Sequence, residues 1–216
     1  SRPRRVLLVE GAPGFDHSFL KRALAGDKSL DVDAVVRKGQ NEQGSDTFYI
    51  QAGEGRGRSL MKGYPAETTA LFSYDAVVLA NVASDQLTEA QLQGTREFVS
   101  RRGGGLIVFG AQSFLARGLV GTPVEDALPV ELNRRSGAQP ASGGAADRAR
   151  LTDQGQDHPV TRLGATTAES RKRWEGLPPL ASTSLLGSPR PGATVLATSM
   201  AGGASRPLIA VQRFGE

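Results

Sequence analysis

A glycine-bounded apolar run in the middle of the chain constrains the fold more than any other feature. Residues 103–114 are Gly-Gly-Gly-Leu-Ile-Val-Phe-Gly-Ala-Gln-Ser-Phe. A continuous apolar run that ends in glycine is typical of a strand buried on both faces and followed by a sharp turn. In many α/β enzymes this turn carries a nucleophile in the pattern G-x-nucleophile-x-G. Here Gln112 occupies the nucleophile position and Phe114 the second glycine position. An amide is not a useful nucleophile, so we expect an enzyme-like scaffold without a catalytic residue.

Other apolar runs predict further strands of the same sheet, at residues 6–9, 32–36 and 75–80. A helix is expected between the first two, with Asp16 as N-cap and Gly26 at its end. Thr88 and Gln91 have the spacing of a capping box and predict a second helix that ends near residue 103. The resulting β-α-β order predicts an α/β fold with a mainly parallel sheet, in which strands 6–9, 76–80 and 105–110 are neighbours.

The rest of the chain gives weaker signals. We expect one inward face on the first helix, a polar excursion over residues 37–64 that extends from the body, and an exposed loop over residues 134–149. Thr166 and Glu169 predict another capped helix, which carries Trp174. The apolar runs at 193–197 and 208–211 are expected to close the sheet. The residues expected on the inward face of the first helix are Phe15, Phe19, Leu20, Ala23 and Leu24.

Length and charge limit the class of protein. A chain of 216 residues fits a single domain over residues 1–216, and its two ends favour a module excised from a longer protein. No apolar run approaches the roughly 20 residues that span a bilayer, so we expect no direct membrane insertion by this segment. The net charge is +4, but the basic residues are dispersed and only 6% of residues are aromatic. This pattern favours a solvated basic surface over a nucleic-acid site.

The carboxyl edge of the parallel sheet is the expected place for a ligand. If the strand at residues 6–9 lies centrally, this edge would gather Glu10, Gly11, Asn81 and residues 110–113, which include Gln112 and Ser113. His158 is a further candidate for the same crevice. These residues are either ligand contacts or turn-formers whose side chains bond nearby backbone groups. We also expect the turn to be relaxed, with Gln112 at negative φ and Phe114 turned into the core, because Phe114 would clash at the second glycine position.

Ser113 and His158 form the one pair that resembles a serine hydrolase. Ser113 lies outside the pattern G-x-S-x-G, and His158 precedes Pro159 in a segment that is equally typical of a turn in which the imidazole satisfies backbone groups. No dinucleotide or P-loop pattern is present, and two histidines without cysteine are too few for a transition-metal site. No cofactor and no metal are therefore expected.

Seven segments spread along nearly the whole chain follow one another in a characteristic order: residues 9–13, 19–24, 63–66, 71–75, 98–104, 121–130 and 174–180. With these segments in this order, the chain resembles a class I glutamine amidotransferase-like domain of a largely uncharacterised group of bacterial membrane-anchored proteins. In that group the domain often follows a von Willebrand factor type A module.

The resemblance implies a flavodoxin-like three-layer sandwich and a membrane-tethered parent protein. Working amidotransferases use a cysteine at the elbow, and a histidine with a glutamate; here Gln112 replaces the cysteine and Val160 the glutamate after His158-Pro159. We therefore expect a non-catalytic module that binds a small ligand, a neighbouring domain of its parent protein or another envelope protein. The alternatives are a hydrolase of altered chemistry that uses Ser113 or His158 with Glu10, and a structural spacer.

Overall fold

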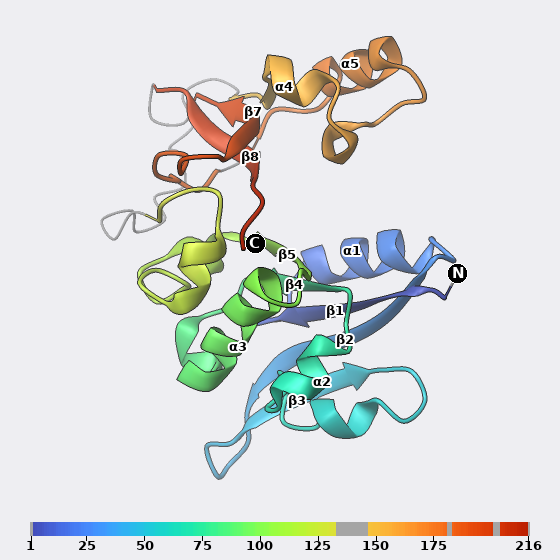
Figure 1. Cartoon of the computed structure of the whole chain (residues 1–216), viewed down its shortest axis with the longest axis vertical. Coiled ribbons are helices and arrows are strands. Elements are labelled where there is room, and N and C mark those ends of the chain that lie inside the picture. The colour runs from blue at the N-terminus through green and yellow to red at the C-terminus, as the bar shows by residue number, and fades with distance from the viewer. Residues whose placement is uncertain (1, 133–146, 181–182, 201–203, 216) are drawn as a thin grey trace. The chain divides into compact units, whose positions relative to one another are not determined.

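The computed structural model describes residues 2–132, 147–180, 183–200 and 204–215. It divides into two compact units, and each is described by itself (Figure 1). Unit 1 contains residues 1–113, 117–127 and 214–216, and unit 2 contains residues 114–116 and 128–213. The expectation of one domain over residues 1–216 stays a prediction, since a domain can contain two compact units.

Unit 1 is built on a five-stranded sheet of order β3-β2-β1-β4-β5. The strands β1 (Arg4–Glu10), β2 (Leu30–Gln40), β4 (Ala76–Ala80) and β5 (Gly105–Phe109) are parallel to one another. β3 (Asp46–Gln51) runs antiparallel to β2 at one edge. The predicted mainly parallel α/β sheet is confirmed, and so is the adjacency of the strands at residues 6–9, 76–80 and 105–110.

The helices of unit 1 begin where local capping signals allow. α3 (Glu89–Ser100) has the predicted capping box, in which Thr88 Oγ1 accepts from Gln91 N at 3.2 Å and Gln91 Oε1 accepts from Thr88 N at 2.8 Å. α1 (Phe15–Ala25) ends at the predicted Gly26, but its N-cap is Gly14 rather than Asp16. The prediction of Asp16 as cap was wrong because the helix begins two residues earlier than that cap would place it and includes Asp16. Unit 1 also has a short helix α2 (Thr68–Phe72).

The core of unit 1 occupies both faces of the sheet. On one face Val6, Leu8, Ala34 and Val78 form a buried cluster against which Leu20 and Leu24 of α1 pack. Figure 1 shows α1 on one side of this sheet and α2 and α3 on the other. On the face opposite α1, the side chains of Leu7, Val77, Leu79, Leu71 and Phe98 are also buried.

Three residues expected in this core are instead exposed. Phe19 is 65% exposed, and the Arg22 guanidinium carbon lies 5.4 Å from its ring centroid. Ala23 is exposed as well, and the side chain of Phe15 lies outside the described part of the structure. The core contacts of α1 are Leu20 and Leu24. Ile107 is 57% exposed, so β5 is not buried on both faces as the apolar run predicted. Within the described ranges β5 is an edge strand that pairs with β4, so its side chains have a neighbouring strand on one side only.

Residues 37–64 are not the predicted excursion. β2 continues to Gln40, and β3 returns antiparallel beside it, with Gly39 opposite Thr47 and Ala34 opposite Gln51. A 3-10 helix, η1 (Gly57–Leu60), follows, and its Leu60 side chain is fully buried. Residues 46–51 are rich in aromatic and β-branched side chains, which favour a strand.

A buried ion-pair network fastens this segment to the sheet. Asp33 of β2 is 0% exposed. Arg56 donates to it from Nε at 2.7 Å and from Nη2 at 2.8 Å, Gly53 N donates at 2.9 Å, and Tyr74 OH donates at 2.7 Å. Arg56 Nη2 also donates to Asp31 Oδ1 at 2.7 Å. Burial raises the pKa of Asp33, but these donors outweigh burial and hold that pKa below its ordinary value.

Unit 2 contains a separate antiparallel sheet. Its strands β6 (Arg150–Leu151), β7 (Thr194–Ser199) and β8 (Arg206–Val211) have the order β6-β7-β8. The prediction that residues 193–197 and 208–211 close the parallel sheet was wrong. These runs pair with each other, with Val195 opposite Ala210. An apolar run predicts a strand but not the sheet it joins.

The helices of unit 2 are short. α4 (Asp153–Gln156) is capped by Thr152, and α5 (Thr167–Glu175) has the predicted capping box between Thr166 and Glu169. Trp174 Nε1 donates to Thr161 O at 2.7 Å, which fastens α5 to η5 (Pro159–Thr161). Most of the predicted exposed loop, residues 134–146 of 134–149, lies outside the described residues. Across the described ranges, no helix has both the length and the apolar character to cross a membrane, consistent with the expectation of no direct insertion.

Candidate binding site at the carboxyl edge of the parallel sheet

The strand order of unit 1 reverses between β1 and β4. From β1 the chain moves outward to β2 through α1, whereas from β4 it moves to β5 on the other side through α3. Glu10, the last residue of β1, is paired with Ala80, the last residue of β4. Ligands of open α/β sheets bind outside the carboxyl ends at such a reversal. The structure thus places Glu10, Gly11 and Asn81 at the edge where the sequence predicted a crevice.

Glu10 is enclosed by the protein. Its side chain belongs to β1 and is 1% exposed. Burying a charged carboxylate is costly unless its surroundings compensate, so this residue is unusual for a strand end. A ligand outside the sheet would reach the Glu10 carboxylate only if the enclosing groups moved.

Gly11 is held by a side chain that the sequence did not indicate. Gly11 N donates to Ala80 O at 2.9 Å, and Gln86 Nε2 donates to Gly11 O at 2.9 Å. The other end of the same amide accepts from Ala83 N at 3.1 Å. A Cβ atom at Gly11 would overlap the carbonyl oxygen of Asn81, so only glycine fits there. Gln86 thus bridges the turn after β1 and the short helix η2 (Ser84–Gln86) after β4.

Asn81 lies in the left-handed region at φ 50°, which no other non-glycine residue in the described part of the chain adopts. Asparagine tolerates this conformation better than most residues. Asn81 N donates to Phe109 O at 3.0 Å, and its Oδ1 accepts from Gln112 N at 3.4 Å. Gly110 has φ +87°, and a Cβ atom there would overlap the Asn81 side chain. The ends of β4 and β5 are therefore packed against each other through Asn81.

The turn after β5 is the 3-10 helix η3 (Ala111–Phe114). Gln112 is not among the residues with positive φ, so the prediction of a relaxed elbow is confirmed for its backbone. The companion prediction for Phe114 was wrong, because this side chain is half-buried and is not a core residue. The 3-10 turn avoids the strained conformation that the elbow pattern requires.

The Ser113 hydroxyl both accepts a hydrogen bond from and donates one to the backbone of unit 1. Its side chain is 0% exposed, its Oγ accepts from Val82 N at 3.0 Å, and the same hydroxyl donates to Phe109 O at 3.1 Å. The hydroxyl thus links the segment after β4 to the end of β5. A nucleophile must be reachable by substrate and hydrogen-bonded to a base. Here the hydroxyl proton is directed at a backbone carbonyl.

His158 belongs to unit 2, whereas Ser113 belongs to unit 1. It caps η5, where its Nδ1 accepts from Val160 N at 3.2 Å and Thr161 N donates to His158 O at 3.1 Å. Of the two interpretations given by the sequence, the structure supports the turn in which the imidazole satisfies a backbone group.

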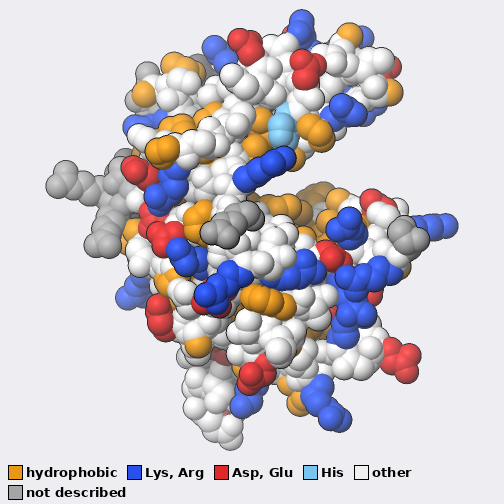
Figure 2. All heavy atoms as spheres, in the orientation of Figure 1, with side chains coloured by type: hydrophobic (Ala, Val, Ile, Leu, Met, Phe, Trp, Pro, Cys, Tyr) orange, Lys and Arg blue, Asp and Glu red, His pale blue; other side chains and the backbone are white. Residues whose placement is uncertain are grey.

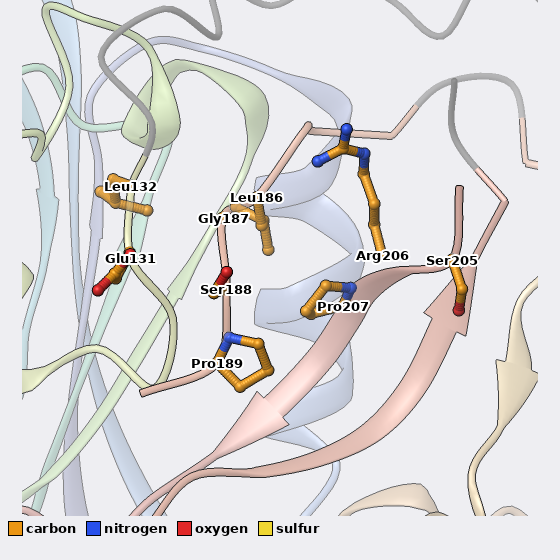
Figure 3. Close-up of a pocket in the computed structure, with 9 residues that line it drawn as sticks. All are labelled: Glu131, Leu132, Leu186, Gly187, Ser188, Pro189, Ser205, Arg206 and Pro207. Atoms are coloured by element: carbon orange, nitrogen blue, oxygen red, sulfur yellow. The ribbon is translucent and has the colours of Figure 1, made fainter. Parts of the chain in front are cut away.

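Unit 2 contains a pocket of about 510 Å³ that the sequence did not predict (Figure 3). Residues 131–132 and 186–189 form one wall, and residues 205–207, at the start of β8, form the other. Glu131 and Arg206 come from opposite walls, and Figure 3 shows that their charged heads do not converge on one point. A pocket of this size can hold a small molecule, but the charged groups that line it are not arranged around a common ligand atom.

Neither the surface charge in Figure 2 nor the possible metal ligands among the described residues indicate a further site. On the face shown in Figure 2, Lys and Arg side chains lie in several separate places, with Asp, Glu and uncharged atoms among them. The predicted absence of nucleic-acid binding stays a prediction. Within the described ranges, no group of three or more His, Asp or Glu side chains could hold a metal ion.

Comparison of the chain with protein-family models, with curated proteins and with solved structures gives no match. The fold and the geometry of the carboxyl edge are therefore the observations on which a function can be proposed.

Proposed function

We propose that the chain is a non-catalytic, amidotransferase-like module that binds a partner or a small ligand. The bonding of Ser113 carries this proposal. It is the hydroxyl nearest to the nucleophile position, and it is buried and bonded on both sides by backbone groups. Gln112, at the nucleophile position itself, presents an amide from a relaxed turn. Neither residue is suited to attack a carbonyl carbon.

The strand order supports a flavodoxin-like fold for unit 1. The four parallel strands lie across the sheet in the order β2-β1-β4-β5. If these four strands are numbered 1 to 4 along the chain, the order is 2-1-3-4. The flavodoxin-like order begins in the same way, 2-1-3-4-5. We infer that unit 1 is a reduced relative of the three-layer sandwich, with the antiparallel β3 added at the opposite edge.

Uncharged amides are the groups that the carboxyl edge offers to a ligand. The side chains of Asn81 and Gln112 are half-buried there, whereas both ends of the Gln86 amide bond to backbone groups and the Glu10 carboxylate is enclosed. Amides donate and accept hydrogen bonds but carry no charge. We therefore infer that this edge recognises a neutral polar group, such as an amide of a small molecule or of a neighbouring protein.

The parent protein is part of the same proposal. The resemblance favours a membrane-tethered protein in which this module contacts a neighbouring domain or another envelope protein, with the tether supplied by flanking segments. Support for this setting comes only from the order of the resembling segments along the chain.

Assays of the chain and three variants test the absence of catalysis. We expect no ammonia release from glutamine by the chain or by Gln112→Cys, because residue 112 lies in a 3-10 turn without the positive φ of a strained elbow. Ester hydrolysis should be equally absent before and after Ser113→Ala or His158→Ala. Ammonia release by Gln112→Cys, or an esterase activity abolished by either alanine substitution, would favour the hydrolase alternative.

Binding is tested by NMR titration of the labelled chain with glutamine, glutamate and acetamide. The side-chain amide resonances of Asn81 and Gln112 should shift with glutamine and acetamide and less with glutamate. The exposed amide of Gln51 on β3 is an internal control that should not move. If no resonance at the carboxyl edge responds to any probe, the spacer alternative is favoured.

A further inference from the structure

β3 is an open edge of the five-stranded sheet. It pairs with β2 on one side only. Among the described residues, the backbone groups of Asp46–Gln51 have no hydrogen-bond partner other than β2. Alternate N–H and C=O groups along the strand therefore point outward. Such a row of unpaired groups is a template for another strand.

Two usual protections of an edge strand, lysine and proline, are absent from β3. Its sequence, Asp-Thr-Phe-Tyr-Ile-Gln, contains no lysine and no proline. Its single charged side chain, Asp46, is directed to its own sheet, where Arg37 Nη2 donates to it at 2.7 Å. Tyr49 is 52% exposed at the middle of the strand. Natural proteins commonly block an edge with charge, proline or a covering element.

We propose that β3 pairs antiparallel with β3 of a second copy of this chain, so that the two five-stranded sheets become one continuous sheet. A two-fold axis perpendicular to the sheet would relate the copies, as in most homodimers. Each copy would then satisfy the outward backbone groups of the other. This inference is independent of the proposed binding function at the carboxyl edge.

The side chains select one register of this pairing. With Tyr49 opposite its counterpart, Phe48 lies opposite Ile50 on one face of the sheet and Thr47 lies opposite Gln51 on the other. Apolar residues then face apolar residues, and polar residues face polar ones. Such cross-strand pairs stabilise a sheet.

The neighbouring registers are less favourable. Sliding one copy so that Phe48 faces its counterpart places Asp46 opposite Ile50. Sliding it in the other direction brings Asp46 towards Glu54, and like charges on opposing strands are destabilising. The register centred on Tyr49 avoids both contacts.

The ends of β3 carry complementary charges. Glu42 lies in the hairpin turn before the strand and Arg58 lies after it, and both are exposed and make no ion pair within the described ranges. Antiparallel pairing brings the hairpin turn of one copy towards the segment after β3 of the other. Each Glu42 would then approach an Arg58 of the second copy, which favours the antiparallel over the parallel arrangement.

Single cysteines test the register directly, because the chain has no cysteine of its own. Opposite residues of antiparallel strands have Cα atoms about 4.5–5.5 Å apart, within the range of about 4.4–6.8 Å that a disulfide spans. We expect Tyr49→Cys to form a disulfide-linked dimer under mild oxidation. Ile107→Cys is the matched control, since Ile107 is 57% exposed on the other edge strand, and it should stay monomeric under the same conditions.

Sedimentation equilibrium tests the interface without cross-linking. The chain should dimerise reversibly in the micromolar range at physiological salt, and Tyr49→Lys should weaken the dimer by about tenfold or more because two lysines would then face each other. Ile107→Lys should leave the dimerisation constant unchanged. Glu42→Arg should weaken the dimer, and adding Arg58→Glu to it should restore dimerisation. Circular dichroism checks that each variant is folded.

Three results would overturn this inference. One is a chain that stays monomeric throughout the micromolar range. Another is equal cross-linking of Tyr49→Cys and Ile107→Cys, which would mean random collision or an interface on β5. The third is a dimer that is insensitive to Tyr49→Lys.

Discussion

Removing the Arg56 guanidinium would test the buried ion-pair network most directly. Arg56→Met keeps much of the side-chain volume and removes the charge that faces Asp33, whose side chain is 0% exposed. Breaking a buried pair by removing one partner typically costs about 3–5 kcal/mol. The Arg56 side chain is itself 19% exposed, and Gly53 N and Tyr74 OH still donate to Asp33. We therefore expect a loss of about 2–4 kcal/mol in the free energy of unfolding.

The assay is urea unfolding followed by far-ultraviolet circular dichroism. Tryptophan fluorescence reports separately on unit 2, because Trp174 is the single tryptophan of the chain and belongs to that unit. Arg117→Met is the matched control. Arg117 of unit 1 is exposed and makes no ion pair in the described part of the chain, so its replacement should change stability by no more than about 0.5 kcal/mol.

The pH dependence of this loss gives a second test. With Arg56 present, the pKa of Asp33 is lowered, so the network contributes stability above the ordinary pKa of aspartate and loses it as pH falls through the lower folded value. Without Arg56, burial is opposed by fewer donors and the folded pKa rises. Protonation then relieves the buried charge, so the difference between the chain and Arg56→Met should shrink below about pH 5. A loss below about 0.5 kcal/mol at pH 7, or one that does not change on acidification, would refute this reasoning.

Two further substitutions test local features of unit 1. Gly110→Ala should lower the free energy of unfolding by about 1–3 kcal/mol in thermal unfolding, because alanine is strained at φ +87° and its Cβ would overlap Asn81. Gly57→Ala is the control and should be tolerated, because the space around Gly57 is open. Thr88→Ala should cost about 1 kcal/mol in urea unfolding through loss of the α3 cap, and Thr88→Ser should retain most of that stability. Equal effects of the two glycine substitutions, or of alanine and serine at residue 88, would contradict these assignments.

The features predicted correctly from the sequence are those with a local signal. The parallel strands follow from apolar runs, and the starts of α3 and α5 follow from capping boxes at Thr88 and Thr166, which depend on residues three apart. β3 also had a signal in its aromatic and β-branched residues. The surrounding glycine-rich and polar segments made this strand look like part of a loop.

Features set by distant residues were not predictable in the same way. An apolar run is the same in an edge strand and in a central one, so the exposure of Ile107 depends on the absence of a partner beyond β5. The runs at β7 and β8 did not reveal that they pair with each other. At the candidate site, the approach of Glu10 to the end of β4 followed from topology, whereas the bridge from Gln86 to Gly11 joins residues far apart in the chain and has no sequence pattern.

Unit 1 is formed by segments that are far apart in the chain, and this determines the order in which its contacts can form during translation. Phe214 returns to α3, where the Arg96 guanidinium carbon lies 5.6 Å from its ring centroid, and Gly215 lies against Ser100. The polypeptide from residue 128 to residue 213, which forms nearly all of unit 2, must therefore leave the ribosome before these last contacts of unit 1 can form. The parallel sheet needs no residue beyond Phe109, whereas the surface of α3 around Arg96 is completed only after residues 214–215 have emerged.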